Sequence, residues 1–178
     1  MDDLIFMDDT IQFYEVDSSY IEYLSQFDSN VVQYKENRKY IGIMILLDDI
    51  KYVAPLTSNK NNTKEYLKKA PYRQVTLSLC NNNQELGFIR FGNMIPVFDH
   101  VLTKVDINSQ QDEKYKYLLL KQYICITSPS CRENIARIVK RVLKIANNNN
   151  HYLHTVPGGI CDIFKLIDKM EEYIDLTS

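Results

Sequence analysis

Hydrophobic and polar residues alternate in short blocks along the first part of the chain, which is typical of β-strands. Two apolar runs, at 40–47 and 50–56, are separated only by Asp48 and Asp49. They predict a β-hairpin, and we expect its second strand to end at Pro55, because proline cannot donate a hydrogen bond to a neighbouring strand. The same pattern predicts strands at 11–16, 74–80, 85–91, 94–98 and 102–107.

The pattern changes to a helical period in the second part of the chain. The clearest helix is predicted at 129–147, because its apolar residues recur at helical spacing, Ser128 suits the N-cap and Pro129 suits the first turn. Further helices are predicted after the capping-box residues Ser19 and Glu22, at 64–70 between Thr63 and Pro71, at 113–126 and at 160–174.

These elements together predict one α+β domain spanning residues 1–178. Its core would be a highly twisted antiparallel sheet or a small barrel of about six or seven strands, flanked by about four helices. Gly87 lies inside a predicted strand and indicates a β-bulge or a close approach of another backbone.

The composition is that of a folded protein that is not exported. A chain of 178 residues with a hydrophobic fraction of 45% can bury one core. No apolar run is long enough to span a membrane, and the acidic start at 1–3 is unlike a signal peptide, so we expect a soluble, cytoplasmic protein. The cysteines lack CxxC spacing, which favours reduced thiols over a zinc site or a disulfide framework. They are Cys80, Cys125, Cys131 and Cys161.

The net charge of −2 by itself argues against strong binding to nucleic acid, but the charges are unevenly distributed. Residues 1–28 carry eight acids and neither Lys nor Arg. Two later segments are basic and would neutralise several phosphates if they lay on one face, although each alone also fits the solvated side of a helix. Their cations are Lys60, Lys64, Lys68, Lys69 and Arg73, and then Arg132, Arg137, Lys140, Arg141 and Lys144.

A polar turn, Thr57–Lys60, follows the central hairpin and gathers two hydroxyls, an amide and an ammonium. Hydroxyl and backbone N–H groups donate to phosphate oxygens, and a lysine supplies compact positive charge. The turn is therefore a candidate phosphate site. An ordinary solvated turn accounts for the same residues.

The chain also resembles the ToxN/AbiQ family, the protein toxins of type III toxin–antitoxin systems. Five segments carry the resemblance in the family's order and spacing, over roughly two thirds of the chain. They are FYEVDSSYIEYLSQFD (13–28), KYIGI (39–43), KYVAPLTSNK (51–60), LGFI with NMIPV (86–89 and 93–97) and YKYLLLKQYICI (115–126).

The resemblance implies a metal-independent endoribonuclease without a cofactor, similar in fold to the small-barrel ribonuclease toxins Kid and MazF. It implies cleavage at adenine-rich sites and a role in phage defence by abortive infection. Because no metal-activated water is evident, we expect the cuts to leave 2′,3′-cyclic phosphate and 5′-hydroxyl ends. It also implies a partner, a small folded, pseudoknot-like RNA antitoxin that the toxin processes and binds in a closed toxin–RNA assembly.

The resemblance further implies the residues of the site. Thr57, Ser58 and Lys60 match the family's Thr-Ser-Pro-Lys motif, with Asn59 where proline is common. Metal-free RNA cleavage needs a proton acceptor, a proton donor and stabilisation of the charge on phosphate. Our hypothesis is that Thr57 and Ser58 position the phosphate, while Lys60 stabilises charge and is the first candidate for acid–base catalysis.

Three more candidates precede the hairpin. Tyr34 aligns with a tyrosine that lines the family's site, and Arg38 stands where relatives can carry a catalytic lysine, with Lys39 next to it. Arginine clamps phosphate well but transfers protons poorly, because it stays charged. Arg38 or Lys39 would therefore stabilise charge beside Lys60.

Tyr115 and Gln122 match family positions that face the site, although spacing alone explains them as one packed helix face with Leu118 and Leu119. Two alternatives stay open. One is a non-catalytic RNA-binding or protein-interaction module, in which the polar turn only grips a backbone. The other is a metal-dependent hydrolase, for which the candidate ligands are His151, His154 and Cys161.

Overall fold

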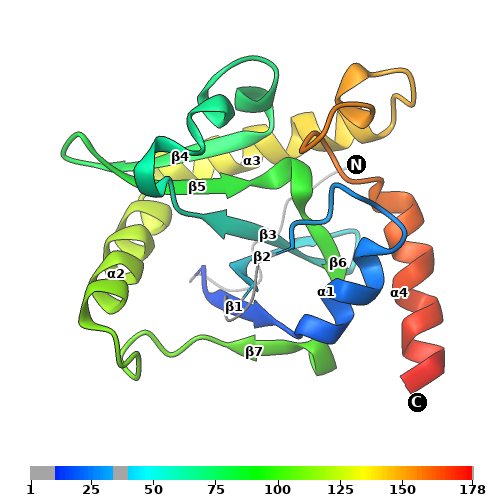
Figure 1. Ribbon diagram of the computed structural model, residues 1–178, viewed down its shortest axis with the longest axis horizontal. Coiled ribbons are helices and arrows are strands. Elements are labelled where there is room, and N and C mark those ends of the chain that lie inside the picture. Colours follow the sequence, from blue (N-terminus) through cyan, green and yellow to red (C-terminus); the bar gives the residue numbers. More distant parts are fainter. Residues whose placement is uncertain (1–10, 34–39, 178) are drawn as a thin grey trace.

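The structure is a computed structural model that describes residues 11–33 and 40–177 (Figure 1). Seven strands form an antiparallel sheet in the order β4-β5-β3-β2-β1-β7, and β6 pairs with β3 off this path. Strands β4 and β7 form the two edges of the sheet. The structure therefore has the predicted twisted open sheet and not the predicted small barrel. The strands are β1 Phe13–Val16, β2 Tyr40–Leu47, β3 Ile50–Thr57, β4 Thr76–Asn81, β5 Gln84–Arg90, β6 Ile95–Val97 and β7 Leu102–Lys104.

The predicted central hairpin is confirmed as β2 and β3, but the expected end of its second strand is wrong. Asp48 and Asp49 form the turn with φ values of 46° and 64°. Pro55 lies within β3, where it pairs with Gly42 of β2, and the strand continues to Thr57. The proline is tolerated because pairing passes from β2 to β5 just beyond it.

Four helices are described, as predicted, and none of them is long and apolar enough to cross a membrane. Their bounds are α1 Ser18–Ser25, α2 Glu113–Thr127, α3 Pro129–Ala146 and α4 Ile163–Thr177. The predicted start of α3 is confirmed, because the Ser128 hydroxyl caps it and Pro129 is its first residue.

Two predicted helix starts are wrong. Asp17, not Ser19, caps α1, because its carboxylate accepts hydrogen bonds from the first free backbone N–H groups of the helix. Helix α4 begins at Ile163 rather than Ile160. The three residues before it stay non-helical because Ile160 and Cys161 are buried, and the Cys161 N–H donates to the Gly92 carbonyl at 2.7 Å.

The helix predicted at 64–70 is also wrong. Segment 60–74 instead forms three short 3₁₀ turns, of which the second replaces the predicted helix: η1 Lys60–Asn62, η2 Glu65–Lys68 and η3 Tyr72–Gln74. Only Leu67 is buried in them, so the segment lacks the apolar face that stabilises a longer helix. The Lys64 N–H also donates to the Asn59 side chain at 2.7 Å, outside any helical pattern.

The core forms two clusters on opposite faces of the central strand. Tyr52 and Ala54 of β3 belong to the main cluster, which α2 and α3 cover, and Val53 belongs to the second, which α1 and α4 cover. Since successive side chains of a strand point to opposite faces, both faces of β3 are buried. Figure 1 shows α3 running behind β4 and β5, with α1 and α4 at the other end of the sheet. Of the four free cysteines, Cys131 and Cys161 are buried.

We expect Tyr20→Phe to lower the free energy of unfolding by about 1–3 kcal/mol, the cost of leaving a buried polar group without its partner. The fully buried Tyr20 hydroxyl donates to the Pro96 carbonyl at 2.8 Å and links α1 to β6. Tyr117→Phe, at a side chain that is 60% exposed, should change stability little. Urea denaturation measures both variants, and equal unfolding free energies would contradict the prediction.

Candidate active site

Strand β3 ends in the polar turn Thr57–Lys60. Thr57 is the last residue of the strand, is only 6% exposed and pairs with Phe88 of β5. Ser58 and Lys60 are exposed, and Lys60 begins η1. The turn therefore presents a hydroxyl and an ammonium to solvent beside a buried threonine.

Gly87 allows β5 to approach this turn closely. Its φ is +124°, and a Cβ atom at this position would lie 2.6 Å from the Thr57 carbonyl oxygen and 3.4 Å from Ser58 Cα. Any side chain here would push the turn away from β5. The pairing of β4 with β5 also shifts its register beside Gly87, as in a β-bulge, so the predicted bulge or close approach is confirmed.

Gln122 of α2 lies beneath the turn. It is 4% exposed, and its Nε2 atom donates to the Leu86 carbonyl at 2.7 Å and lies 3.4 Å from the Cβ position of Gly87. Tyr115, two helical turns earlier on α2, packs against the main core. Gln122 therefore lies at the turn, as the resemblance implies. Tyr115 lies on the packed helix face that the spacing predicts.

Asn59 connects the turn to two neighbouring segments. Its Nδ2 atom donates to Glu65 Oε1 at 2.6 Å and to Glu85 Oε1 at 2.5 Å, and its Oδ1 atom accepts from the Lys64 N–H at 2.7 Å. The residue that replaces the family's usual proline therefore holds the turn by side-chain hydrogen bonds. Sequence reasoning missed this role, because the partner Glu85 lies on another strand.

Lys68 closes this network between two carboxylates. It forms ion pairs with Glu65, at 3.0 Å, and with Glu85. Hydrogen bonds from Lys68 and then Asn59 lower the pKa of Glu65, and hydrogen bonds to Glu85 and then Glu65 raise the pKa of Lys68. The charge of Lys68 is thus already balanced by carboxylates of the protein. Its binding to RNA stays a prediction.

The remaining predicted RNA-binding cations lie on two elements. Lys64 and Lys69 flank η2 and Arg73 lies in η3. The other four are exposed along α3: Arg137, Lys140, Arg141 and Lys144. Lys68 lies 6.0 Å from the Phe88 ring centroid, whereas the next residue, Ile89, belongs to the main core with Val139 of α3. Because neighbouring strand residues face opposite ways, segment 60–74 and α3 cover opposite faces of the β4–β5 hairpin.

Tyr34, Arg38 and Lys39 lie outside the described residues, so their assignment to the site stays a prediction. The described chain resumes at Tyr40, which pairs with Val16 of β1.

The candidate metal ligands have other partners. His151 Nδ1 accepts from the Leu153 N–H at 3.3 Å, and His154 Nε2 lies 3.0 Å from the Ile145 carbonyl oxygen. Burial raises the pKa of the Cys161 thiol. Within 11–33 and 40–177, no three His, Cys, Asp or Glu side chains come together in a group that could hold a metal ion.

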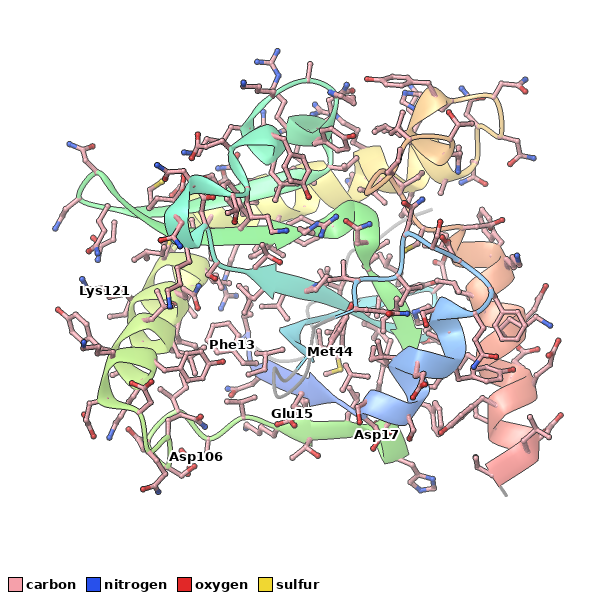
Figure 2. All side chains as sticks on the ribbon, viewed as in Figure 1. Phe13, Glu15, Asp17, Met44, Asp106 and Lys121 are labelled. Atoms are coloured by element: carbon pink, nitrogen blue, oxygen red, sulfur yellow. The ribbon has the colours of Figure 1, made fainter. Side chains whose placement is uncertain are left out.

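A cavity of about 1110 Å³ lies beside β1 and α1, apart from the turn. Its lining includes Glu15, Asp17, Glu22 and His100. Figure 2 shows Glu15 and Asp17 near β7, away from the β4–β5 hairpin. Its described lining is acidic, because it holds three carboxylates.

The fold is similar to that of solved toxins of type III toxin–antitoxin systems. The structure of AbiQ, a lactococcal anti-phage endoribonuclease of a type III toxin–antitoxin system, superposes with a TM-score of 0.76 at 26% identity, covering 93% of this chain and 99% of that one. A second solved toxin, selectively inhibited by a non-coding RNA pseudoknot, gives 0.74 at 28% identity, covering 93% and 98%.

The chain belongs to the ToxN family, toxins of type III toxin–antitoxin systems, whose family model matches residues 12–173. It is 30% identical to the endoribonuclease ToxN of Bacillus thuringiensis subsp. kurstaki, over 93% of this chain and 85% of the relative. It is 34% identical to the endoribonuclease AbiQ of Lactococcus lactis subsp. lactis, over 89% and 86%. The resemblance seen in the sequence is confirmed.

We expect Asn59→Ala to loosen the turn, because it removes all three hydrogen bonds of the side chain. Amide hydrogen exchange at Lys64 should speed up, and the free energy of unfolding should fall by about 1–3 kcal/mol. The exposed Asn150→Ala variant is the control. Unchanged protection of the Lys64 amide in Asn59→Ala would show that the side chain does not hold the turn.

Proposed function

We propose that this protein is an endoribonuclease toxin and that the turn Thr57–Lys60 is its active site. The relatives named endoribonuclease ToxN and AbiQ support the activity. The observation that carries the site is the turn itself, which matches the family's motif and presents Ser58 and Lys60 to solvent while Asn59 and Gly87 hold its backbone. The substrate is cellular or phage RNA, with adenine-rich sites as the expected preference.

The proposed reaction is a transesterification. The 2′-oxygen of a ribose loses its proton and bonds to the adjacent phosphorus, the bond from phosphorus to the 5′-oxygen breaks, and that oxygen takes up a proton. The products are a 2′,3′-cyclic phosphate and a 5′-hydroxyl. This chemistry needs acid, base and charge stabilisation but no metal-activated water.

The exposed atoms of the turn divide these tasks. The Ser58 hydroxyl donates to a phosphoryl oxygen, and the Lys60 ammonium offsets the charge that develops there. Thr57 is buried, so its part is to fix the backbone from which Ser58 projects. Arg38 or Lys39 and Tyr34 complete the proposed site, with Gln122 supporting the turn from below.

We also propose a small folded RNA antitoxin as the inhibitory partner in a closed toxin–RNA assembly. The two basic segments cover opposite faces of the β4–β5 hairpin rather than one face, so each would contact a different part of the RNA in this assembly. One solved relative is selectively inhibited by a non-coding RNA pseudoknot, and another belongs to an antiviral system that a processed non-coding RNA regulates. We further propose that the protein acts against phages by abortive infection and that it works in the cytoplasm.

Lys60→Ala should slow RNA cleavage about 30- to 1000-fold, because it removes one contact to the transition state worth about 2–4 kcal/mol. The assay uses purified protein and mixed-sequence RNA in EDTA, with the ends of the fragments identified. Lys104→Ala, at an exposed lysine of β7, is the matched control. Cyclic phosphate ends that disappear only in Lys60→Ala are the expected result.

Cleavage at the wild-type rate by a folded Lys60→Ala protein would refute the assignment of Lys60. Loss of wild-type cleavage in EDTA would refute metal independence. The competing function, a non-catalytic RNA-binding module, predicts RNA that shifts on a gel yet stays intact, and binding that survives Lys60→Arg. An enzyme that moves a proton through Lys60 should lose activity in Lys60→Arg, because arginine stays charged.

A further inference from the structure

The outer face of α3 carries a row of four cations, which we call the α3 stripe. They are Arg137, Lys140, Arg141 and Lys144, and each is exposed. Residues three and four apart lie on the same side of a helix, so the four side chains line one face, opposite the buried Ile135 and Val142. From the first cation to the last, the row is about 10 Å long at the rise of a helix. The stripe is therefore a short, straight line of charge on a regular support.

The charge of the stripe is not balanced within the described parts of the chain. Helix α3 contains one acid, Glu133, against five cations. Among the described residues, none of the four stripe cations forms an ion pair. Arg137 Nη2 donates to Asn134 Oδ1 at 2.6 Å, but this amide is neutral and leaves the charge of the guanidinium uncompensated. Lys68, by contrast, is paired with two carboxylates. The stripe thus favours a polyanionic partner.

The stripe offers no side chain on which an unpaired base could stack. In the described chain, none of the exposed large hydrophobic residues belongs to α3. They are Tyr66, Tyr117, Ile124, Tyr152, Phe164 and Leu176. Proteins that hold single strands combine cations with exposed aromatic rings, whereas double-stranded RNA is bound through its shape, its phosphates and its 2′-hydroxyls. A double helix also carries about twice the phosphate charge of one strand per unit length. These features favour base-paired RNA.

The stripe also lies away from the candidate active site. The face of the β4–β5 hairpin under α3 holds Ile89, which belongs to the main core with Val139. Thr57 pairs with the neighbouring residue, Phe88, whose side chain points to the opposite face. Figure 1 shows α3 behind β4 and β5. RNA that contacts the turn Thr57–Lys60 therefore meets the stripe with a different part of its fold.

We propose that the α3 stripe binds the phosphates of base-paired RNA. In the toxin–RNA assembly it holds a double-helical part of the antitoxin, while the turn Thr57–Lys60 contacts an unpaired part. This inference rests on the proposed function for its partner. The stripe contacts phosphates and not base edges, so its binding depends on charge and on the shape of the double helix rather than on sequence.

The test measures the binding of a short mixed-sequence RNA duplex and of one of its single strands over a range of salt concentrations. Both probes carry 2′-fluoro groups, which cannot attack phosphorus, so they stay intact. Lys140→Gln/Lys144→Gln should weaken duplex binding about tenfold or more. It should reduce the slope of log K against log salt by about 1.8, because each phosphate contact of a double helix contributes about 0.9.

The matched control is Lys104→Gln/Lys114→Gln, which removes the same charge from β7 and α2 and should leave the slope unchanged. Binding of the single strand should fall no further in the stripe variant than in this control. An equal loss of duplex binding in the two variants would overturn the proposal, because net charge alone would then explain it.

Unchanged duplex affinity and slope in a folded Lys140→Gln/Lys144→Gln protein would also overturn the proposal. If this variant does not fold, Arg141→Gln alone decides, with an expected slope change of about 0.9, and an unchanged slope would overturn the proposal. Wild-type protein that binds no duplex in low salt would overturn it too, and would indicate an acidic protein as the partner of the stripe.

The binding readout needs no cleavage, so the two proposals can fail separately. Duplex binding that depends on the stripe, in a protein that cuts no RNA, refutes the enzyme alone. RNA cleavage that depends on Lys60, together with duplex binding that does not depend on the stripe, refutes the role of the stripe alone.

Discussion

The close approach of Gly87 to the carbonyl of Thr57 is the constraint on which the candidate site depends. Strand β3 leaves β2 after Pro55 and pairs with β5 for only two residues, so the turn that follows has little regular hydrogen bonding to hold it. The contact at Gly87 sets the distance between β5 and the turn, and Gln122 supports the same place from α2. A glycine in a strand therefore determines where Ser58 and Lys60 stand.

The charges around the turn follow from this geometry. Because β5 comes close, Glu85 reaches Asn59 and Lys68, and these residues with Glu65 form a hydrogen-bonded network with a net charge of −1 beside the turn. The network fixes the turn by hydrogen bonds, and its one excess carboxylate charge leaves the positive charge near the turn to Lys60, Lys64 and Lys69. The acidic cavity beside β1 lies elsewhere, so the net charge of −2 does not conflict with a local phosphate site.

Local patterns predicted most of the elements. The hairpin of β2 and β3, the seven strands and the cap of α3 could be predicted, because each depends on neighbours within a few residues. Gly87 in a strand pattern indicated a bulge or a close approach, but only the fold shows that Thr57 is the residue approached. The 3₁₀ turns of segment 60–74 could not be predicted, because they depend on side-chain hydrogen bonds of Asn59 to Lys64 and Glu65 and on the lack of an apolar face.

The most direct test of this account is the rate of RNA cleavage by Gly87→Ala, measured beside its far-UV circular dichroism. The added Cβ would overlap the Thr57 carbonyl, so the turn must move while the core, which Gly87 does not fill, keeps its helices and strands. Displacement of catalytic groups by about 1 Å costs about a hundredfold in rate. The account predicts a loss of this order in a folded protein, and wild-type cleavage by folded Gly87→Ala would contradict it.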